Sequence, residues 1–465
     1  MSLTDLTGRY PERAPERDGW ILARRGGRNP LDPFRPHGLL VEEERAEAGE
    51  IVSVATIFLT NRECPWRCLM CDLWKHTLVE SVPAGAIPAQ IDYALAELAK
   101  QRRAGFQPAS AGESPVAGDN GKQPLSPNPR IQIPSREISL RQGPPSHRSS
   151  PPGSAPVELG AVPARRSADF SPPPAVSPGR QGSGLKSALL NSMAVPPGRE
   201  GARTFPPPLH GLAVQLESLG TAPRQIKLYN SGSFFDPRAI PPPDYQAVAE
   251  RVRAFDRVIV ECHPALVGES ALKFRDLLGA TDSNRANPPP YGGRCGRKLE
   301  VAMGLETAHP EVLEKLNKRM TLDQFRRAAE FLCANGIALR VFVLVKPPFL
   351  GEAEALHWAE RSVDFAFDCG ATAVSLIPTR FGNGALEALA GHGEFSPPKL
   401  STLEAALQYG IRLRRGRVFA DLWDLEKFSV CSICFEQRRA RLKEMNLAQA
   451  PEPPIVCDCC SRQTK

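Results

Sequence analysis

Short runs of β-branched and apolar residues alternate with amphipathic segments along most of the chain, and this alternation limits the fold more than any other feature. A short apolar run followed by helical periodicity is typical of βα units around a parallel sheet. The expected strands are residues 51–59, 225–229, 257–261, 300–305, 339–345 and 371–377. Apolar residues recur every three or four positions in the expected helices, residues 88–103, 242–254, 269–278, 322–334, 352–367 and 400–414. Six βα units predict an α/β fold, a partial (βα)6 TIM-like barrel whose site lies at the carboxyl ends of its strands.

Residues 104–210 interrupt this alternation. The chain has 47 prolines, about twice the usual share, and many of them lie here among Ser, Gly and Arg. Such a segment buries too little apolar surface to offset its chain entropy, so we expect a long disordered insertion. A loop over residues 279–298 has the same composition. The expected domains are an N-terminal extension (1–50), a core barrel (51–415) broken by these two segments, and a C-terminal Cys-rich metal-binding region (416–465).

The formal net charge of +7 does not by itself indicate a nucleic-acid-binding surface. Between Phe106 and Pro208, 11 Lys or Arg residues stand against 6 Asp or Glu, so this stretch carries five of the seven positive charges. The rest of the chain is nearly neutral, which gives little support for RNA binding through charge. No apolar run reaches the roughly 18 residues of a membrane helix, and no hydrophobic signal core follows Met1, so we expect a cytoplasmic protein without a membrane partner.

Directly after the first expected strand, Cys64, Cys68 and Cys71 form a C-x3-C-x2-C loop. Eight of the 12 cysteines lie in this group or in a second group near the C-terminus, and in a chain of this length such grouping indicates metal or cluster binding. Three thiolates bind three irons of a [4Fe-4S] cluster and leave the fourth iron open to a non-protein ligand. The alternative is a structural zinc site with His76 as fourth ligand.

This loop, at the mouth of the expected barrel, resembles that of the radical S-adenosylmethionine superfamily, and the resemblance covers residues 51–380 apart from the insertion. It implies that the three cysteines are catalytic and hold a [4Fe-4S] cluster whose open iron is chelated by S-adenosylmethionine. An electron from a reductant such as ferredoxin or flavodoxin would then cleave S-adenosylmethionine to a 5′-deoxyadenosyl radical. Family members often have an aromatic residue where this chain has Met70, which is still expected to pack over the cofactor.

The same resemblance assigns cofactor contacts to the ends of several strands. The turn after the second strand is built from small residues, which let a ligand approach the backbone closely. The residues assigned to cofactor binding are Met70, Asn230, Ser231, Gly232, Ser233, Glu261, Glu306 and Ile377. Arg340 and Lys346 are further candidates for binding a carboxylate, and His263 is a candidate for catalysis.

The second cysteine group comprises Cys431-Ser-Ile-Cys434 and Cys457-Asp-Cys459-Cys460. Two CxxC pairs about twenty residues apart bring four thiolates to one centre. The expected ligands are Cys431, Cys434, Cys457 and either Cys459 or Cys460, and the C-x2-C spacing favours Cys460. The metal is expected to be zinc in a ribbon or, in the alternative, a second iron-sulfur cluster.

The order of the segments LTNRECPWRCLMC, IKLYNSGSFFDP, VIVECHP and GLETAHPEVLEKLNKRMT resembles the branch that includes the Elongator catalytic subunit, and within it the radical subunit family of archaeosine synthases. The resemblance implies a tRNA-modifying lyase or transferase that abstracts a hydrogen from a lysine adduct of a 7-deazaguanine base and breaks a carbon-nitrogen bond to leave a formamidine. It also implies a lysine-transferase subunit that delivers the tRNA, while the basic residues 412–417 and 437–443 are candidates for phosphate contacts. Two alternatives stay open: a radical enzyme acting on a small metabolite or peptide, and a non-catalytic iron-sulfur or zinc scaffold.

Overall fold

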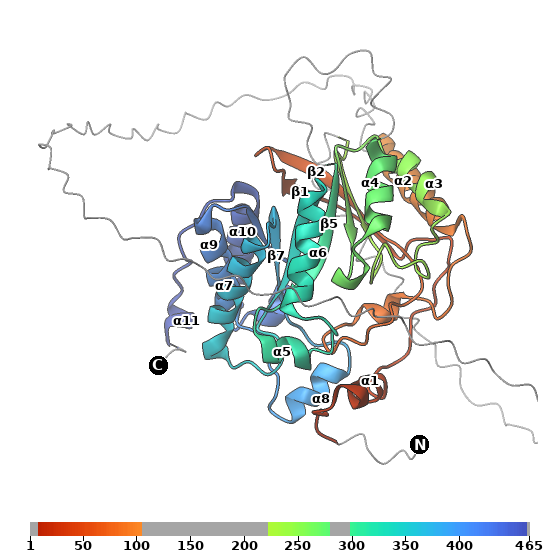
Figure 1. Ribbon diagram of the computed structural model, residues 1–465. Coiled ribbons are helices and arrows are strands. Elements are labelled where there is room, and N and C mark those ends of the chain that lie inside the picture. The colour runs from red at the N-terminus through yellow and green to blue at the C-terminus, as the bar shows by residue number, and fades with distance from the viewer. Residues whose placement is uncertain (1–7, 105–221, 280–297, 463–465) are drawn as a thin grey trace, which may run out of the picture. The chain divides into compact units, whose positions relative to one another are not determined.

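A computed structural model describes residues 8–104, 222–279 and 298–462, which belong to one of the two units into which the chain divides. The second unit, 111–204, lies outside the described residues, as do nearly all of the predicted 104–210 insertion and 279–298 loop. The centre of the described unit is an eight-stranded sheet with its strands in chain order (Figure 1). The strands are β1 (Gly38–Arg45), β2 (Ile51–Phe58), β3 (Gln225–Tyr229), β4 (Arg257–Glu261), β5 (Leu299–Glu306), β6 (Ala338–Val345), β7 (Ala373–Pro378) and β8 (Arg417–Ala420).

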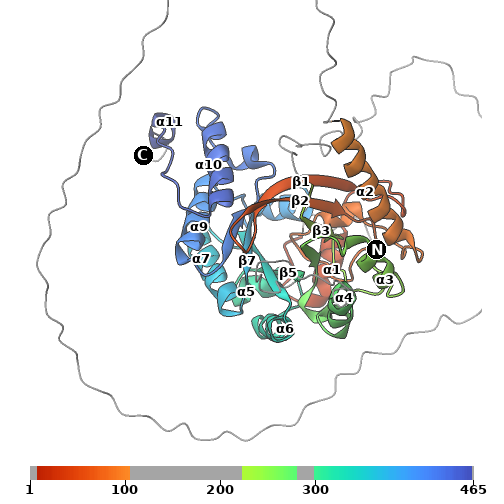
Figure 2. The ribbon, with the colours of Figure 1, turned by 90° about the horizontal axis from the view of Figure 1, so that it is seen from above.

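The sheet from β2 to β8 is parallel, and β1 pairs with β2 in the antiparallel sense. Figure 2 shows that the sheet curls and that helices surround its outer side. These helices are α2 (Ala86–Ala104), α3 (Asp244–Val252), α4 (Glu269–Gly279), α6 (Leu322–Ala334), α7 (Glu352–Asp368) and α9 (Leu400–Leu413). The predicted partial barrel is thereby confirmed.

Successive residues of the strands point to opposite faces of the sheet, as strand geometry requires. In β3, Ile226 and Leu228 join the apolar core that packs against the outer helices. Lys227 and Tyr229 alternate with them and therefore face the inside of the barrel. The outer face thus supplies the hydrophobic stabilisation, whereas the inner face is free to carry polar side chains.

Two strands, β1 and β8, were not among the six expected from the sequence. Two inward residues of β1 are charged: Glu44 pairs with Arg340, and both Glu42 and Glu44 approach the ammonium of Lys227 at 2.7 Å. The cationic partners of these glutamates lie far along the chain. The local sequence GLLVEEER therefore shows only an acidic run, which does not predict a buried strand. The strand β8 has only four residues, which is short for recognition by alternation.

The interior of the barrel at the amino ends of the strands is filled by a network of buried ion pairs. Glu300 accepts from Arg257 at 2.7 Å and from Arg340 at 2.6 Å, and Arg417 lies 3.4 Å from the same carboxylate. The neighbouring Arg340 and Arg417 charges hold the pKa of Glu300 at about 2, against the effect of its burial. Paired charges therefore occupy the inner face at this end of the barrel.

Helix α10 (Phe435–Ala448) lies across the gap between β1 and β8, the two edges of the sheet. Its last turn and the residue that follows it bond to both edges: Arg45 donates to the carbonyl of Leu447 at 3.2 Å, and the backbone of Val418 donates to Gln449 at 2.7 Å. Helix α11 (Asp458–Arg462) follows it. The C-terminal segment therefore completes the wall of the barrel.

Three further helices are α1 (Ala14–Leu22), α5 (Pro310–Lys315) and α8 (Ala385–Gly391), and Figure 1 places them together beyond the carboxyl ends of the strands. The guanidinium of Arg17 in α1 bonds to Glu314 in α5 at 2.7 Å, and Trp20 packs against residues of α8. The N-terminal segment therefore covers part of the barrel mouth. None of the helices in the described ranges has the length and apolar character that crossing a membrane requires.

Candidate functional site

The cysteine loop follows β2 directly, so its three thiols lie at the carboxyl end of the barrel. The loop contains little regular structure, and hydrogen bonds from other segments hold it. The backbone N–H of Leu69 donates to the carbonyl of Leu316 at 2.9 Å, and the side-chain amide of Asn383 donates to the carbonyl of Leu69 at 2.7 Å. Segments that follow β5 and β7 therefore fix the position of the loop.

Burial raises the pKa of all three loop thiols, that of Cys68 to about 12 and that of Cys71 well above its usual value. Binding of iron displaces the thiol protons, because the thiolate is the ligand. His76, the alternative zinc ligand, stacks on His37 with ring centroids 4.9 Å apart, and its Nδ1 lies 3.2 Å from the side-chain amide of Asn29. Its ring is thus engaged with the N-terminal segment.

Glu63, the residue before Cys64, anchors the loop through three guanidinium groups. Arg25 lies 2.6 Å from its carboxylate, Arg67 lies 3.0 Å away, and Arg28 pairs with the second oxygen. Burial opposes the charge on Glu63, but the hydrogen bonds from Arg28 and Arg25 lower its pKa on balance. The N-terminal segment and the cysteine loop therefore share one buried ionic contact.

The turn after β3, residues 230–233, packs directly against the cysteine loop. A Cβ atom added at Gly232 would lie 3.1 Å from the Cβ of Cys64, so a larger residue would push the two segments apart. Ser231 has a φ of 54°, which gives the turn its tight curvature. The side-chain amide of Asn230 is fully buried, and neither its oxygen nor its nitrogen has a partner among the described residues. Such orphaned polar atoms are rare and favour a ligand at this position.

Glu261 at the end of β4 holds this turn in place. Its carboxylate accepts from the backbone N–H of Asn230 at 3.0 Å, and the N–H groups of Ser231 and Gly232 also act on it. Burial raises the pKa of Glu261 to about 7, against the effect of these three donors. The carboxylate therefore shapes the turn, and its direct contact with a cofactor stays a prediction.

Glu306, at the end of β5, forms a buried ion pair with Lys318 at 2.6 Å. Burial opposes the charge on Lys318, but the carboxylate of Glu306 raises its pKa above the usual value. Glu306 has a φ of 67°, and a Cβ atom at Gly304 would lie 2.1 Å from its carboxylate, so this pair occupies space that only glycine leaves free. Sequence reasoning missed Lys318, because nothing in the segment KLNKRM distinguishes the one buried lysine from its exposed basic neighbours.

His263 lies at the same rim as Glu261, and both of its ring nitrogens are engaged, one with the carbonyl of Lys318 and the other with the N–H of Ala265. Burial lowers the pKa of His263 to about 3. The residue is therefore neutral and has no free nitrogen for proton transfer.

The two other basic candidates are engaged elsewhere. Arg340 belongs to the ion network at the opposite end of the barrel. Lys346 donates to Glu352 and to Ser396, each at 2.8 Å. Neither residue therefore has an uncommitted charge for a cofactor carboxylate.

Met70 and Ile377 provide apolar surface at the barrel mouth. Both are partly buried and pack against one small cluster of buried residues from the segment after β5, the end of β6 and the loop after β6: Val312, Leu316, Leu344 and Leu350. Their predicted packing against a cofactor is compatible with these positions and stays a prediction.

The C-terminal cysteines gather as the spacing predicts. The sulfurs of Cys431, Cys434, Cys457 and Cys460 all lie within 4.8 Å of one another, with Cys431 Sγ 3.8 Å from Cys457 Sγ and Cys434 Sγ 3.6 Å from Cys460 Sγ. The backbone N–H groups of Cys434 and Ile433 lower the pKa of Cys431 to about 6. Within the described ranges no other set of three potential metal ligands, the loop cysteines included, is drawn together as closely.

The two basic stretches are largely engaged within the protein. Arg438 and Arg441 of α10 pair with Glu404 of α9 at 2.6 and 3.4 Å. In the stretch 412–417, Arg415 pairs with Asp368 and Arg417 belongs to the buried network. Half of the eight basic residues in the two stretches therefore pair with acidic residues of other segments.

No protein-family model matches the chain, but comparison with known proteins finds relatives in sequence. Archaeosine synthase subunit beta of Methanosarcina acetivorans is 28% identical over 275 residues, which cover 55% of this chain and 73% of the relative. The corresponding subunit of Thermococcus kodakarensis is 28% identical over 43% of this chain and 58% of its own length. An uncharacterized protein of Methanocaldococcus jannaschii is 26% identical over 38% of this chain and 45% of its own. The chain thus spans between about half and three quarters of these relatives.

Among solved structures, the Methanocaldococcus infernus Elp3 with an N-terminal deletion aligns at 15% identity and a TM-score of 0.36, over 50% of this chain and 57% of that one. Methylornithine synthase aligns at 16% identity and a TM-score of 0.33, over the same shares.

The cysteine loop at the mouth of a partial βα barrel is compatible with the resemblance to the radical S-adenosylmethionine superfamily that the sequence motifs indicate. Among the sequence relatives, the chain is similar to archaeosine synthase subunit beta.

Replacing Glu63 tests the ionic anchor of the loop. Glu63→Ala leaves three guanidinium groups without their shared partner, so we expect the free energy of unfolding to fall by about 2 kcal/mol. Because the folded-state pKa of Glu63 lies below its usual value of 4.5, this loss should be full above that pH and shrink as the pH falls below it. Chemical denaturation at several pH values measures both effects. Glu80→Ala, at an exposed position, is the control; equal stability of the two variants at pH 7 would contradict the anchor.

Proposed function

We propose that the chain is a radical S-adenosylmethionine enzyme that modifies tRNA, acting as a lyase on a 7-deazaguanine base that carries a lysine adduct. The bond broken is a carbon-nitrogen bond of the lysine chain, which leaves a formamidine on the base. The observation that carries the proposal is the loop of three thiols next to buried polar groups without described partners, at the carboxyl end of a βα barrel. A site in such a fold lies at this end.

The residues at the barrel mouth fit the cofactors that this activity requires. Cys64, Cys68 and Cys71 would hold a [4Fe-4S] cluster with one iron open, and the unpartnered amide of Asn230 suits the polar groups of S-adenosylmethionine. When bound, the cluster and S-adenosylmethionine supply a 5′-deoxyadenosyl radical, and the electron would come from ferredoxin or flavodoxin.

Around these groups the chain's own residues would orient the cofactor. The turn 230–233, shaped by Glu261, would receive its amino group. The ion pair of Glu306 and Lys318 would face its charged methionine part, and Met70 and Ile377 would exclude water beside it.

Aromatic side chains on the inner face of the barrel support a planar substrate. Phe58, the last residue of β2, lies 5.9 Å from the ring of Trp423 and 6.5 Å from that of Tyr229. Trp423 follows β8 at the same rim and is 43% exposed. A half-exposed indole with further rings behind it provides a stacking surface for a base extruded from RNA.

The tRNA itself would be delivered by a partner. The sequence relatives are named as beta subunits, which supports a second subunit, here proposed to be the lysine transferase. The ion pairs of Arg417, Arg438 and Arg441 support the same conclusion, because these three basic residues of the stretches predicted for phosphate contact already have partners within the protein.

For the C-terminal cysteines we propose one zinc ion rather than a second iron-sulfur cluster. A zinc-sulfur bond of about 2.3 Å in a tetrahedron separates neighbouring sulfurs by about 3.8 Å. The sulfur separations of 3.6 and 3.8 Å match this value, whereas thiolates on separate irons of a cluster stand farther apart. Zinc would join the start of α10 to α11 and so fix the segment that completes the barrel wall.

Cleavage of S-adenosylmethionine tests the catalytic class. Anaerobically reconstituted protein with dithionite and S-adenosylmethionine should form 5′-deoxyadenosine, measured by liquid chromatography. Cys68→Ala should lower this rate at least about a hundredfold, since two thiolates do not hold a four-iron cluster with one open iron. Cys333→Ala, at a scattered cysteine, should keep the wild-type rate. Wild-type protein that binds the cluster and forms no product would support the non-catalytic scaffold instead.

Mass spectrometry of tRNA nucleosides tests the substrate. We expect cells without the gene to accumulate the 7-deazaguanine base with its lysine adduct, and purified enzyme to convert it in isolated tRNA. An unchanged nucleoside profile, with 5′-deoxyadenosine still formed in vitro, would favour a small metabolite or peptide as substrate.

Elemental analysis tests the metal at the C-terminal cysteines. The wild type should hold one zinc per chain beside its iron, and Cys460→Ser should lose most of the zinc while it keeps iron and sulfide. Cys459→Ser, the neighbouring thiol outside the four-sulfur group, should keep the zinc. Loss of iron and sulfide from Cys460→Ser would instead indicate a second cluster.

A further inference from the structure

His263 contacts three separate parts of the proposed cofactor site. Its imidazole stacks on Trp66 of the cysteine loop, with ring centroids 3.7 Å apart and ring planes 11° from parallel. Its Nε2 lies 3.1 Å from the carbonyl oxygen of Lys318, and its backbone N–H donates to the hydroxyl of Ser233 at 3.3 Å. One residue at the end of β4 therefore joins the loop, the turn after β3 and the segment that carries the buried lysine.

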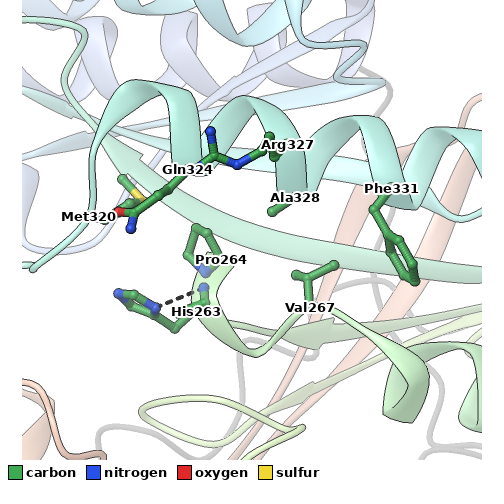
Figure 3. Close-up of a pocket in the computed structure, with 9 residues that line it drawn as sticks. His263, Pro264, Val267, Met320, Gln324, Arg327, Ala328 and Phe331 are labelled. Atoms are coloured by element: carbon green, nitrogen blue, oxygen red, sulfur yellow. Dashed lines mark hydrogen bonds between the residues drawn. The ribbon is translucent and has the colours of Figure 1, made fainter. Parts of the chain in front are cut away.

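Directional contacts fix the orientation of this ring. The backbone N–H of Ala265 donates to Nδ1 at 3.2 Å (Figure 3), so the proton of the neutral imidazole lies on Nε2 and is donated to the carbonyl of Lys318. On the side of α6 (Leu322–Ala334) the packing is open, since a cavity of about 310 Å³ adjoins His263. Figure 3 shows Gln324 and Phe331 on α6 and Met320 just before it, with His263, Pro264 and Val267 on the other side of this space. The stack and the hydrogen bonds, rather than close packing on all sides, therefore determine where the ring lies.

The stack of Trp66 on His263 lies close in sequence to two of the proposed cluster ligands, Cys64 and Cys68. Trp66 lies two residues from Cys64 and two from Cys68, so the position of its ring constrains the backbone that carries both thiols. Cys64 also touches the turn, because a Cβ at Gly232 would lie 3.1 Å from the Cβ of Cys64. Two contacts therefore set the distance between the cysteine loop and the turn 230–233. One is between Gly232 and Cys64, and the other runs from Trp66 through His263 to Ser233.

We propose that His263 is a positioning residue that fixes the distance between the cluster-binding loop and the turn that receives S-adenosylmethionine. The proposal rests on the function proposed above and adds a residue to it. His263 transfers no proton, because both ring nitrogens are already hydrogen-bonded. It acts through Trp66, Ser233 and Lys318.

Two substitutions separate this role from a general effect on folding. His263→Ala removes the stack and the bond to Lys318, whereas His263→Gln keeps an amide donor and loses the ring. His357→Ala is the matched control, because His357 is an exposed histidine whose ring contacts Trp358 on α7. Each protein is reconstituted anaerobically, and iron and sulfide, the electron paramagnetic resonance spectrum of the reduced cluster with and without S-adenosylmethionine, and the rate of 5′-deoxyadenosine formation are measured.

We expect both His263 variants to keep wild-type iron and sulfide, because all three thiols remain. Their KM for S-adenosylmethionine should rise about tenfold, as is usual when a residue behind a metal site is lost, and the spectral change that the cofactor causes should weaken. His357→Ala should match the wild type in every measurement.

Wild-type KM and spectra in both His263 variants would overturn the proposal. If His263→Ala does not fold, His263→Gln decides alone: a raised KM supports the role and an unchanged KM rejects it. These results differ from failure of the proposed function, in which the wild type itself forms no 5′-deoxyadenosine.

Discussion

The geometry of the site depends most on the ion pairs of Glu63. Its carboxylate binds guanidinium groups from two segments. The cysteine loop has little helix or strand to define it, so the positions of its thiols come from side-chain contacts. Arg25 and Arg28 reach Glu63 from the N-terminal segment, and Arg67 reaches it from within the loop. On the opposite side, the stack of Trp66 on His263 ties the same loop to the barrel. The cysteine loop is therefore held by contacts with both the N-terminal segment and the end of β4.

Buried polar groups occur at both ends of the barrel. At the amino ends of the strands, Glu44, Glu300 and Arg340 are buried and fully engaged in ion pairs, which avoids the large cost of an isolated buried charge. At the carboxyl ends, the amide of Asn230 and the side-chain oxygen of Asn61 are buried without a described partner. Unsatisfied buried groups cost folding free energy, and a bound ligand that pairs with them offsets that cost. A ligand bound beside the cysteine loop would therefore offset part of this cost.

The sequence predicted those parts of the fold that depend on local patterns. The strands β2 to β7 and most outer helices were predicted because their outward faces are apolar and regular. It did not predict β1, whose inward glutamates find their partners, Lys227 and Arg340, far along the chain. Arg340 was predicted to bind a carboxylate of a ligand because its actual partners, Glu44 and Glu300, are also distant in the sequence. Close cysteine spacing, by contrast, is a local pattern, and it favoured Cys460, whose sulfur gathers with the other three. Lys318 and the role of His263 arise only from tertiary contacts, which a single sequence does not display.

The account depends on a four-iron cluster with one iron that no protein thiolate binds. Mössbauer spectroscopy of protein reconstituted with the isotope iron-57 tests this most directly, because it distinguishes irons by their ligands. We predict that S-adenosylmethionine changes the signal of one iron in four and leaves the other three unchanged. Four irons that remain equivalent after its addition, or the absence of a four-iron cluster from the wild-type protein, would contradict the account.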